Sequence, residues 1–197
     1  MDVLTAIKTR RSIGRPSQKP VDRDVIETLL DAAAQAPSHH NTFPWRFHVL
    51  TGDARVALGE RLAAALRRSL TEEGQDPESK QGQALLKAEA GKTMRAPVLI
   101  AVSSHPSDAS NVVEREEHFA CAAAVQNMLL AAHALGLAVM WRTGDGSEAP
   151  EVEEWLGLAG RDQIVALVYV GWPEPDTALY PLTRRPWSEL TEWRGFD

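Results

Sequence analysis

The feature that most constrains the fold is an apolar run, FACAAAVQNMLLAA, which spans residues 119–132. It forms the middle of a helix that we expect from Glu114 to Leu135, because Gly136 follows directly and is a typical helix end. The helix itself carries apolar residues on nearly all of its faces, a pattern typical of a helix that is buried on most sides. The run is too short, and with Gln126 and Asn127 too polar, to cross a bilayer. We therefore expect a central helix enclosed by the rest of the chain.

The remaining elements alternate unevenly between helices and strands. We expect helices at about 2–9, 23–35, 54–70, 84–94 and 151–156, and strands at 46–50, 98–103, 137–141 and 164–170. With 197 residues, the chain has the size of one domain, 1–197. The polar stretch 71–83, TEEGQDPESKQGQ, is predicted to be a flexible insertion within it.

Composition excludes several classes of protein. A net charge of −6 disfavours a general nucleic-acid binder, because an acidic surface repels phosphate backbones. One cysteine, Cys121, excludes an internal disulfide and a cysteine-based zinc cluster, and its place among alanines predicts a core residue. The first residues, MDVLTAIKTRRS, contain no apolar signal-peptide core, so we expect a cytoplasmic protein that does not bind membranes.

Common catalytic motifs are missing from the sequence. It contains no nucleophile elbow and no P-loop, and its six histidines lack metal-ligand spacing, so no metal site is predicted. Gly144 to Ala149 (GDGSEA) matches the form of a dinucleotide-binding turn, but Pro150 follows at once and the next helix is barely two turns. A plain glycine turn is the favoured interpretation, and a Rossmann-type dehydrogenase stays as an alternative.

Four clusters could carry chemistry. Arg10, Arg11 and Ser12, with Arg15 close behind, lie at a helix exit, where guanidinium and hydroxyl groups can clamp a phosphate or the polar edge of a flavin. The other three are the loop 36–45 (APSHHNTFPW), the strand end 141–144 (WRTG) and the tail segment 184–187 (RRPW). Each alone has an ordinary structural explanation as a solvated turn, surface loop or charged segment. Together they could converge on one anionic, aromatic ligand.

The order of these clusters resembles that of the FMN-dependent nitroreductase family, and of its short NAD(P)H nitroreductase subgroup in particular. The resemblance rests on RRSIGR, APSHHNTFPWRFHVL, APVLIAV, AAAVQNMLLAAHALGLAVMWRTG and IVALVYVGWPEP, and it runs from residue 1 to about 187. Phe43 stands where the family usually has glutamine, and Gly14 replaces a larger residue. These departures bear on substrate preference more than on flavin binding.

The resemblance implies an α+β fold, with a mixed sheet wrapped by helices, in a homodimer that holds FMN at the subunit interface. Arg10, Arg11 and Ser12 would hold the phosphate, ribityl or pyrimidine part of the flavin, and Arg184 would hold the phosphate. Trp141, Arg142 and Thr143 would complete the pocket. Residues reaching the ring from the partner chain would be Pro37, Ser38, His39 and Asn41.

The implied activity is transfer of a hydride from NADH or NADPH through flavin N5 to a nitroaromatic or quinone-like substrate, with ping-pong kinetics and no catalytic side chain. Two other functions stay open. One is a flavin-binding relative with another chemistry, such as dehalogenation or flavin breakdown. The other is a non-enzymatic, dimeric ligand-binding module. The Pro- and Trp-rich tail, with Trp172, Trp187, Trp193 and Phe196, needs a surface to pack on, and a second subunit is a reasonable candidate.

Overall fold

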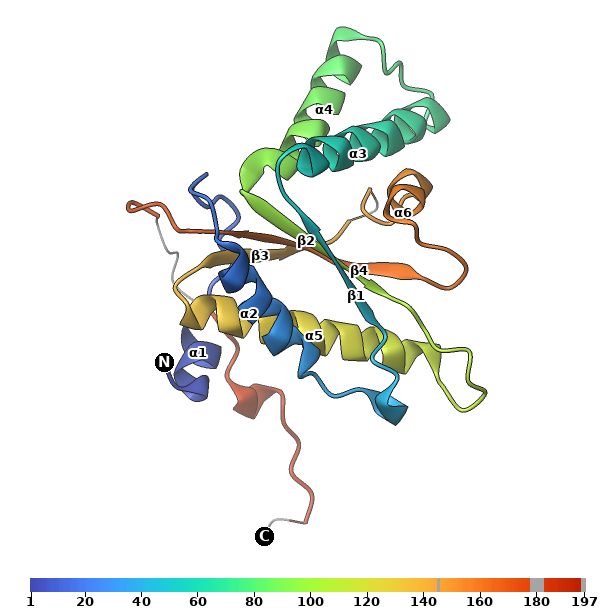
Figure 1. Cartoon of the computed structure of the whole chain (residues 1–197). Helices are drawn as coiled ribbons and strands as arrows, with labels where there is room; N and C mark the ends of the chain where they lie inside the picture. The colour runs from blue at the N-terminus through green and yellow to red at the C-terminus, as the bar shows by residue number, and fades with distance from the viewer. Residues whose placement is uncertain (145, 178–182, 196–197) are drawn as a thin grey trace.

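A four-stranded sheet forms the centre of the protein in a computed structural model that describes residues 1–144, 146–177 and 183–195 (Figure 1). The strands are β1 (Trp45–Leu50), β2 (Val98–Ser104), β3 (Ala138–Arg142) and β4 (Gln163–Gly171). Their order across the sheet is β1-β2-β4-β3, and every neighbouring pair is antiparallel. The α+β class is therefore confirmed, whereas the mixed sheet is wrong for the described strands.

The antiparallel pairing also removes the dinucleotide-binding alternative. The strands on either side of the glycine turn, β3 and β4, run in opposite directions, so no parallel βαβ unit surrounds it. The helix after the turn, α6 (Pro150–Leu156), has seven residues and ends at Gly157 in the left-handed conformation. Asp145 of the turn lies outside the described residues.

Helices cover both faces of the sheet. On one face lie α2 (Arg23–Ala34) and α5 (Glu114–Ala134), and α1 (Val3–Thr9) packs against α5 (Figure 1). On the other face lie α3 (Asp53–Glu72) and α6. Alternating side chains of each strand enter the two cores, as Ile100 and Leu99 of β2 do.

The long helix α5 agrees with the sequence expectation at its core-facing side. Ala120, Cys121, Ala124, Val125 and Met128 are all buried. Its outer side is less buried than the apolar run indicates, since Phe119 is 63% exposed. The exposed ring of Phe119 thus belongs to an apolar part of the α5 surface that this single chain does not cover.

The segment 71–83 differs from its expected form. Helix α3 continues to Glu72, and α4 begins at Lys80, where the side chain of Ser79 caps it by accepting a hydrogen bond from the Gly82 N–H at 3.0 Å. The connection between the helices is therefore only 73–79. Helix α4 (Lys80–Ala90) starts earlier than expected and passes into a 3₁₀ turn, η2 (Gly91–Arg95), before β2.

After β4 the chain leaves the body of the protein. A single 3₁₀ turn, η3 (Trp187–Glu189), is the one helical element in the described part of this tail, which runs past α1 and away from the sheet (Figure 1). Trp187 and Trp193 pack edge to face, 6.1 Å between ring centroids, yet both stay more than half exposed. Phe196 lies outside the described residues. No described helix is long and apolar enough to span a membrane.

Candidate functional site

The basic cluster lies on an extended segment that we call the strap, residues 10–17. It begins where α1 ends and runs along the free edge of β3. The Ile13 N–H donates a hydrogen bond to the Val139 carbonyl at 2.9 Å, and the Ser17 N–H donates one to the Trp172 carbonyl at 2.7 Å. The strap is thus tied at its middle to β3 and at its end to the residue that follows β4, which leaves Arg10, Arg11 and Ser12 next to the β3 edge.

The strap carries positive charge that no acidic side chain pairs with among the described residues. Burial, and then the charges of Arg184 and Arg11, lower the pKa of the Arg10 guanidinium. The pKa of His133 is lowered by burial and then by Arg10 and Arg11, and its Nε2 lies 2.8 Å from Thr9 Oγ1. Within 1–144, 146–177 and 183–195, none of the three arginines forms an ion pair, and the buried Arg11 Nε has no hydrogen-bond partner. Mutual repulsion of this kind favours an anionic ligand.

The end of β3 places the next predicted residues on alternate faces of the sheet. Trp141 turns towards α5, and its indole N–H donates to the Val165 carbonyl at 3.2 Å. Arg142 turns to the opposite face, where its guanidinium lies 5.7 Å from the centroid of the Tyr169 ring. Thr143 is exposed at the strand end. The strap and the residues of this strand end therefore share one edge of the sheet.

A cavity of about 470 Å³ opens beside Arg142. Its apolar wall includes Leu62, Leu66 and Leu167, and its polar lining includes the residues Arg68, Lys92, Arg142, Thr143 and Tyr169. Lys92 pairs with Glu89, and Arg68 pairs with Glu151 at 2.8 Å and Glu72 at 3.2 Å. Of the basic residues that line the cavity, Arg142 alone has no acidic partner in the part of the chain that the structure describes.

The loop 37–43, which we call the histidine loop, has an unusual backbone. His40, Asn41 and Phe43 have φ of 55°, 54° and 48°, the left-handed region that non-glycine residues rarely adopt. Together with α5 the loop forms a groove of about 410 Å³, which is lined by Pro37, Ser38, His39, Glu116, Phe119, Ala120 and Ala123. Side-chain contacts must hold this backbone, because it is costly by itself.

The strap and the histidine loop lie at opposite ends of α5. His133 contacts Thr9 just before the strap, whereas Glu116 Oε2 lies 3.6 Å from His39 Nε2 of the loop. Seventeen residues of helix separate these contacts, which is about 25 Å at 1.5 Å per residue. One chain thus brings together Arg10, Arg11, Ser12, Arg184 and the β3 end, but not Pro37, Ser38, His39 or Asn41.

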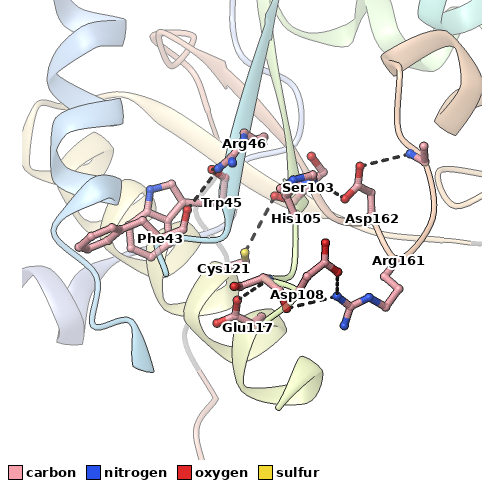
Figure 2. A network of polar contacts seen from close by, with 12 residues as sticks. Phe43, Trp45, Arg46, Ser103, His105, Asp108, Glu117, Cys121, Arg161 and Asp162 are labelled. Carbon is pink, nitrogen blue, oxygen red and sulfur yellow. Dashed lines mark hydrogen bonds and ion pairs between the residues drawn. The ribbon is translucent and has the colours of Figure 1, made fainter. Parts of the chain in front are cut away.

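One buried residue of this region, Glu117, is not among the residues predicted from the sequence. Glu117 is 1% exposed and accepts hydrogen bonds from Thr42 Oγ1 at 2.6 Å and from the Ser107 N–H at 3.2 Å. The signal was available, because Glu117 lies one and two turns before Cys121 and Ala124 on the face that points to the core. Figure 2 shows Glu117 near Cys121, whose pKa burial and the Glu117 charge raise to about 12, as suits an inert core thiol.

The described residues contain no group of three or more His, Cys, Asp or Glu placed to hold a metal ion. Polar pairs do occur at the same end of the sheet, such as His105 Nδ1 with Asp162 Oδ1 at 2.6 Å (Figure 2). They fix loops and are not gathered around a common point.

Comparison with known proteins gives a consistent result. A model of the nitroreductase family matches residues 7–172. The chain is 32% identical over 174 residues to a protein of Escherichia coli (strain K12) named "Putative NAD(P)H nitroreductase YdjA", covering 88% of this chain and 90% of that protein.

Solved structures agree with the sequence matches. A nitroreductase-like family protein from Bacillus cereus superposes with a TM-score of 0.79 at 28% identity, covering 99% of this chain and 97% of that one. A nitroreductase with bound FMN from Bacteroides fragilis has a TM-score of 0.72 at 26% identity and covers 94% and 95% of the two chains.

Proposed function

Because the chain belongs to the nitroreductase family, we propose that it is an FMN-dependent NAD(P)H oxidoreductase that acts as a homodimer on nitroaromatic or quinone-like substrates. One observation carries the proposal. Arg10, Arg11 and Arg184 gather beside the β3 edge with no acidic partner among the described residues, although such a cluster is unfavourable unless an anion joins it.

The donors of the strap fit FMN. Guanidinium groups and a hydroxyl are usual ligands of a phosphate. The buried Arg11 Nε has no hydrogen-bond acceptor among the described residues, so it could donate to a ligand. Arg10, Arg11, Ser12 and Arg184 would hold the phosphate and ribityl part, and Trp141, Arg142 and Thr143 would border the ring. The chemistry that FMN supplies when bound is acceptance of a hydride at N5 from NADH or NADPH and delivery of electrons to the acceptor.

The second half of the site would come from a partner chain. Pro37, Ser38, His39 and Asn41 lie about 25 Å along α5 from the strap, too far to reach a ligand bound there within one chain. In the proposed dimer, the loop of one subunit would lie at the strap of the other, and two-fold symmetry would repeat this contact at a second site. The exposed apolar residues Val3, Leu4, Phe119 and Trp187 supply surface for this contact.

The cavity beside Arg142 would accept the electron-accepting substrate. Its volume suits one or two aromatic rings, and its leucine wall provides apolar contact. Arg142 and Tyr169 would place a polar or anionic substituent at the inner end. The chain's residues would thus bind and orient the substrate and exclude water, with no side chain required as acid or base.

The proposal is tested with the purified protein. We expect it to be yellow, to release about one FMN per chain on denaturation, and to oxidise NADH or NADPH when a nitroaromatic or quinone is added. A protein that stays colourless after incubation with FMN would contradict the proposal. Bound FMN without any NAD(P)H oxidation would favour a ligand-binding module, and loss of intact flavin during turnover would favour flavin breakdown.

A further inference from the structure

The buried carboxylate of Glu117 stands out because it has no ion-pair partner among the residues that the structure describes. Placing a carboxylate in the core is costly unless hydrogen-bond donors surround it. Both donors to Glu117 come from loops: Thr42 belongs to the histidine loop, and Ser107 to the connection after β2. Glu117 therefore ties the histidine loop to the central helix.

The hydrogen bonds beyond Thr42 form a directed chain. The Phe43 N–H donates to Ser38 Oγ at 2.9 Å, Ser38 Oγ lies 3.1 Å from Thr42 Oγ1, and Thr42 Oγ1 lies 2.6 Å from Glu117 Oε1. A hydroxyl has one proton to give. Because Thr42 gives its proton to the carboxylate, Ser38 must give its own to Thr42.

The carboxylate thereby decides what Ser38 can offer to a ligand. An N–H donor begins the chain and an acceptor ends it, so the hydroxyls between them have one orientation. Ser38 has no proton left, and its remaining lone pair can only accept a hydrogen bond. Thr42 has a second acceptor within reach, the His39 carbonyl, but at 3.3 Å this contact is much longer than the one to Glu117.

The same chain supports the costly backbone of the loop. His40, Asn41 and Phe43 are all left-handed, and the hydrogen bonds at Ser38 and Thr42 bracket them. His39, by contrast, is 3.6 Å from Glu116 and mostly exposed, so that pair contributes little.

We propose that Glu117 is a positioning residue for the flavin site: through Thr42 it holds the histidine loop in its binding conformation and makes Ser38 a hydrogen-bond acceptor towards the FMN of the partner subunit. The inference rests on the proposed function. It assigns to Glu117 no contact with FMN and no step of the reaction.

The experiment compares the dissociation constant for FMN of apo-proteins, measured by flavin fluorescence, among four variants. Thr42→Val removes the hydroxyl and should weaken FMN binding at least about fivefold. Thr42→Ser keeps the hydroxyl and should stay within about twofold of wild type. Glu117→Gln should resemble Thr42→Val, because an amide no longer fixes the direction of the chain. Thr28→Val, at an exposed threonine of α2 whose hydroxyl also bonds a carbonyl, is the matched control and should bind like wild type.

Thermal unfolding of the apo-proteins and the visible spectrum of the bound flavin separate positioning from general destabilisation. We expect a changed flavin spectrum in Thr42→Val, recovery in Thr42→Ser, and apo melting temperatures that do not follow the FMN affinities. Equal affinities for Thr42→Val, Thr42→Ser and wild type would overturn the inference, as would equal losses in the two threonine variants. A wild-type protein that binds no FMN would instead refute the proposed function. The threonine pair keeps the test valid if Glu117→Gln does not fold.

Discussion

At the scale of single residues, the proposed flavin site rests on positive charge that no acidic side chain pairs with in the part of the chain that the structure describes. Arg10→Ala removes one of three clustered guanidiniums and should lower FMN affinity about tenfold or more, since a charge-assisted hydrogen bond contributes about 1.5–3 kcal/mol. Flavin fluorescence titration measures the effect. Arg23→Ala, an exposed arginine paired with Glu27, is the control and should bind normally. Unchanged affinity in Arg10→Ala would remove Arg10 from the site.

The pH dependence of stability is a second prediction at this scale. Burial, Arg10 and Arg11 hold the folded pKa of His133 below its ordinary value of 6.5. Below pH 6.5 the unfolded chain binds a proton at His133 more readily than the folded chain does. The free energy of unfolding should therefore fall as the pH falls from 6.5 towards the folded pKa, whereas above pH 6.5 the contribution of His133 is fully present. Urea unfolding of apo-protein across this range should show a smaller fall in His133→Gln. An identical fall in both proteins would show that His133 does not contribute.

Sequence patterns identified the charged residues of the proposed site as candidates, but not its buried carboxylate. Arg10 and Arg142 could be proposed from the sequence because a basic residue at a helix exit or at the end of a buried strand needs an anionic partner. Glu117 was not predicted, although its spacing to Cys121 and Ala124 places it on the core-facing side of the helix, because a glutamate at the start of a helix is usually solvated. Its burial also depends on two loops that fold over it from distant parts of the chain.

At the scale of elements, the strap is held against the sheet where the Pro16 ring packs closely on Gly171. A Cβ at this position would lie 2.8 Å from Pro16 Cβ and from Pro97 Cδ, and neither ring can yield. Gly171→Ala should cost about 1–3 kcal/mol of stability and weaken FMN binding by displacing the strap. Gly91→Ala is the control, because nothing lies within 4 Å of a Cβ there. Denaturant unfolding measures the stability of the two variants, and FMN titration measures their affinity for FMN. Equal stability and equal affinity in Gly171→Ala and Gly91→Ala would contradict this role of Gly171.

Most elements could be predicted from periodicity and end signals, including α5 and all four strands. Strand direction could not, because the antiparallel pairing of β1 with β2 is set by how α3 and α4 return the chain, which no local pattern encodes. The same limit applies to the polar stretch 71–83, where helix caps outweigh composition.

At the scale of the whole molecule, the proposed homodimer would cover apolar side chains that are exposed in one chain, Phe119 among them. Phe119→Asp places a charge where the proposed subunit contact buries the ring, so the protein should become monomeric and lose FMN while keeping its fold, since Phe119 is 63% exposed in one chain. Sedimentation velocity and circular dichroism measure these effects. Val56→Asp, at an exposed valine of α3, should stay dimeric. A dimeric, flavin-loaded Phe119→Asp protein would contradict the proposed interface.

The central claim is that each flavin site combines the strap of one chain with the histidine loop of another. Mixing Arg10→Ala and Ser38→Val proteins after joint refolding tests it most directly, at an FMN concentration where neither binds alone. Mixed dimers contain one site with both halves intact, so a 1:1 mixture should recover FMN binding in about a quarter of its sites. No recovery, although mixed dimers form, would show that strap and loop act within one chain, and the account would be wrong.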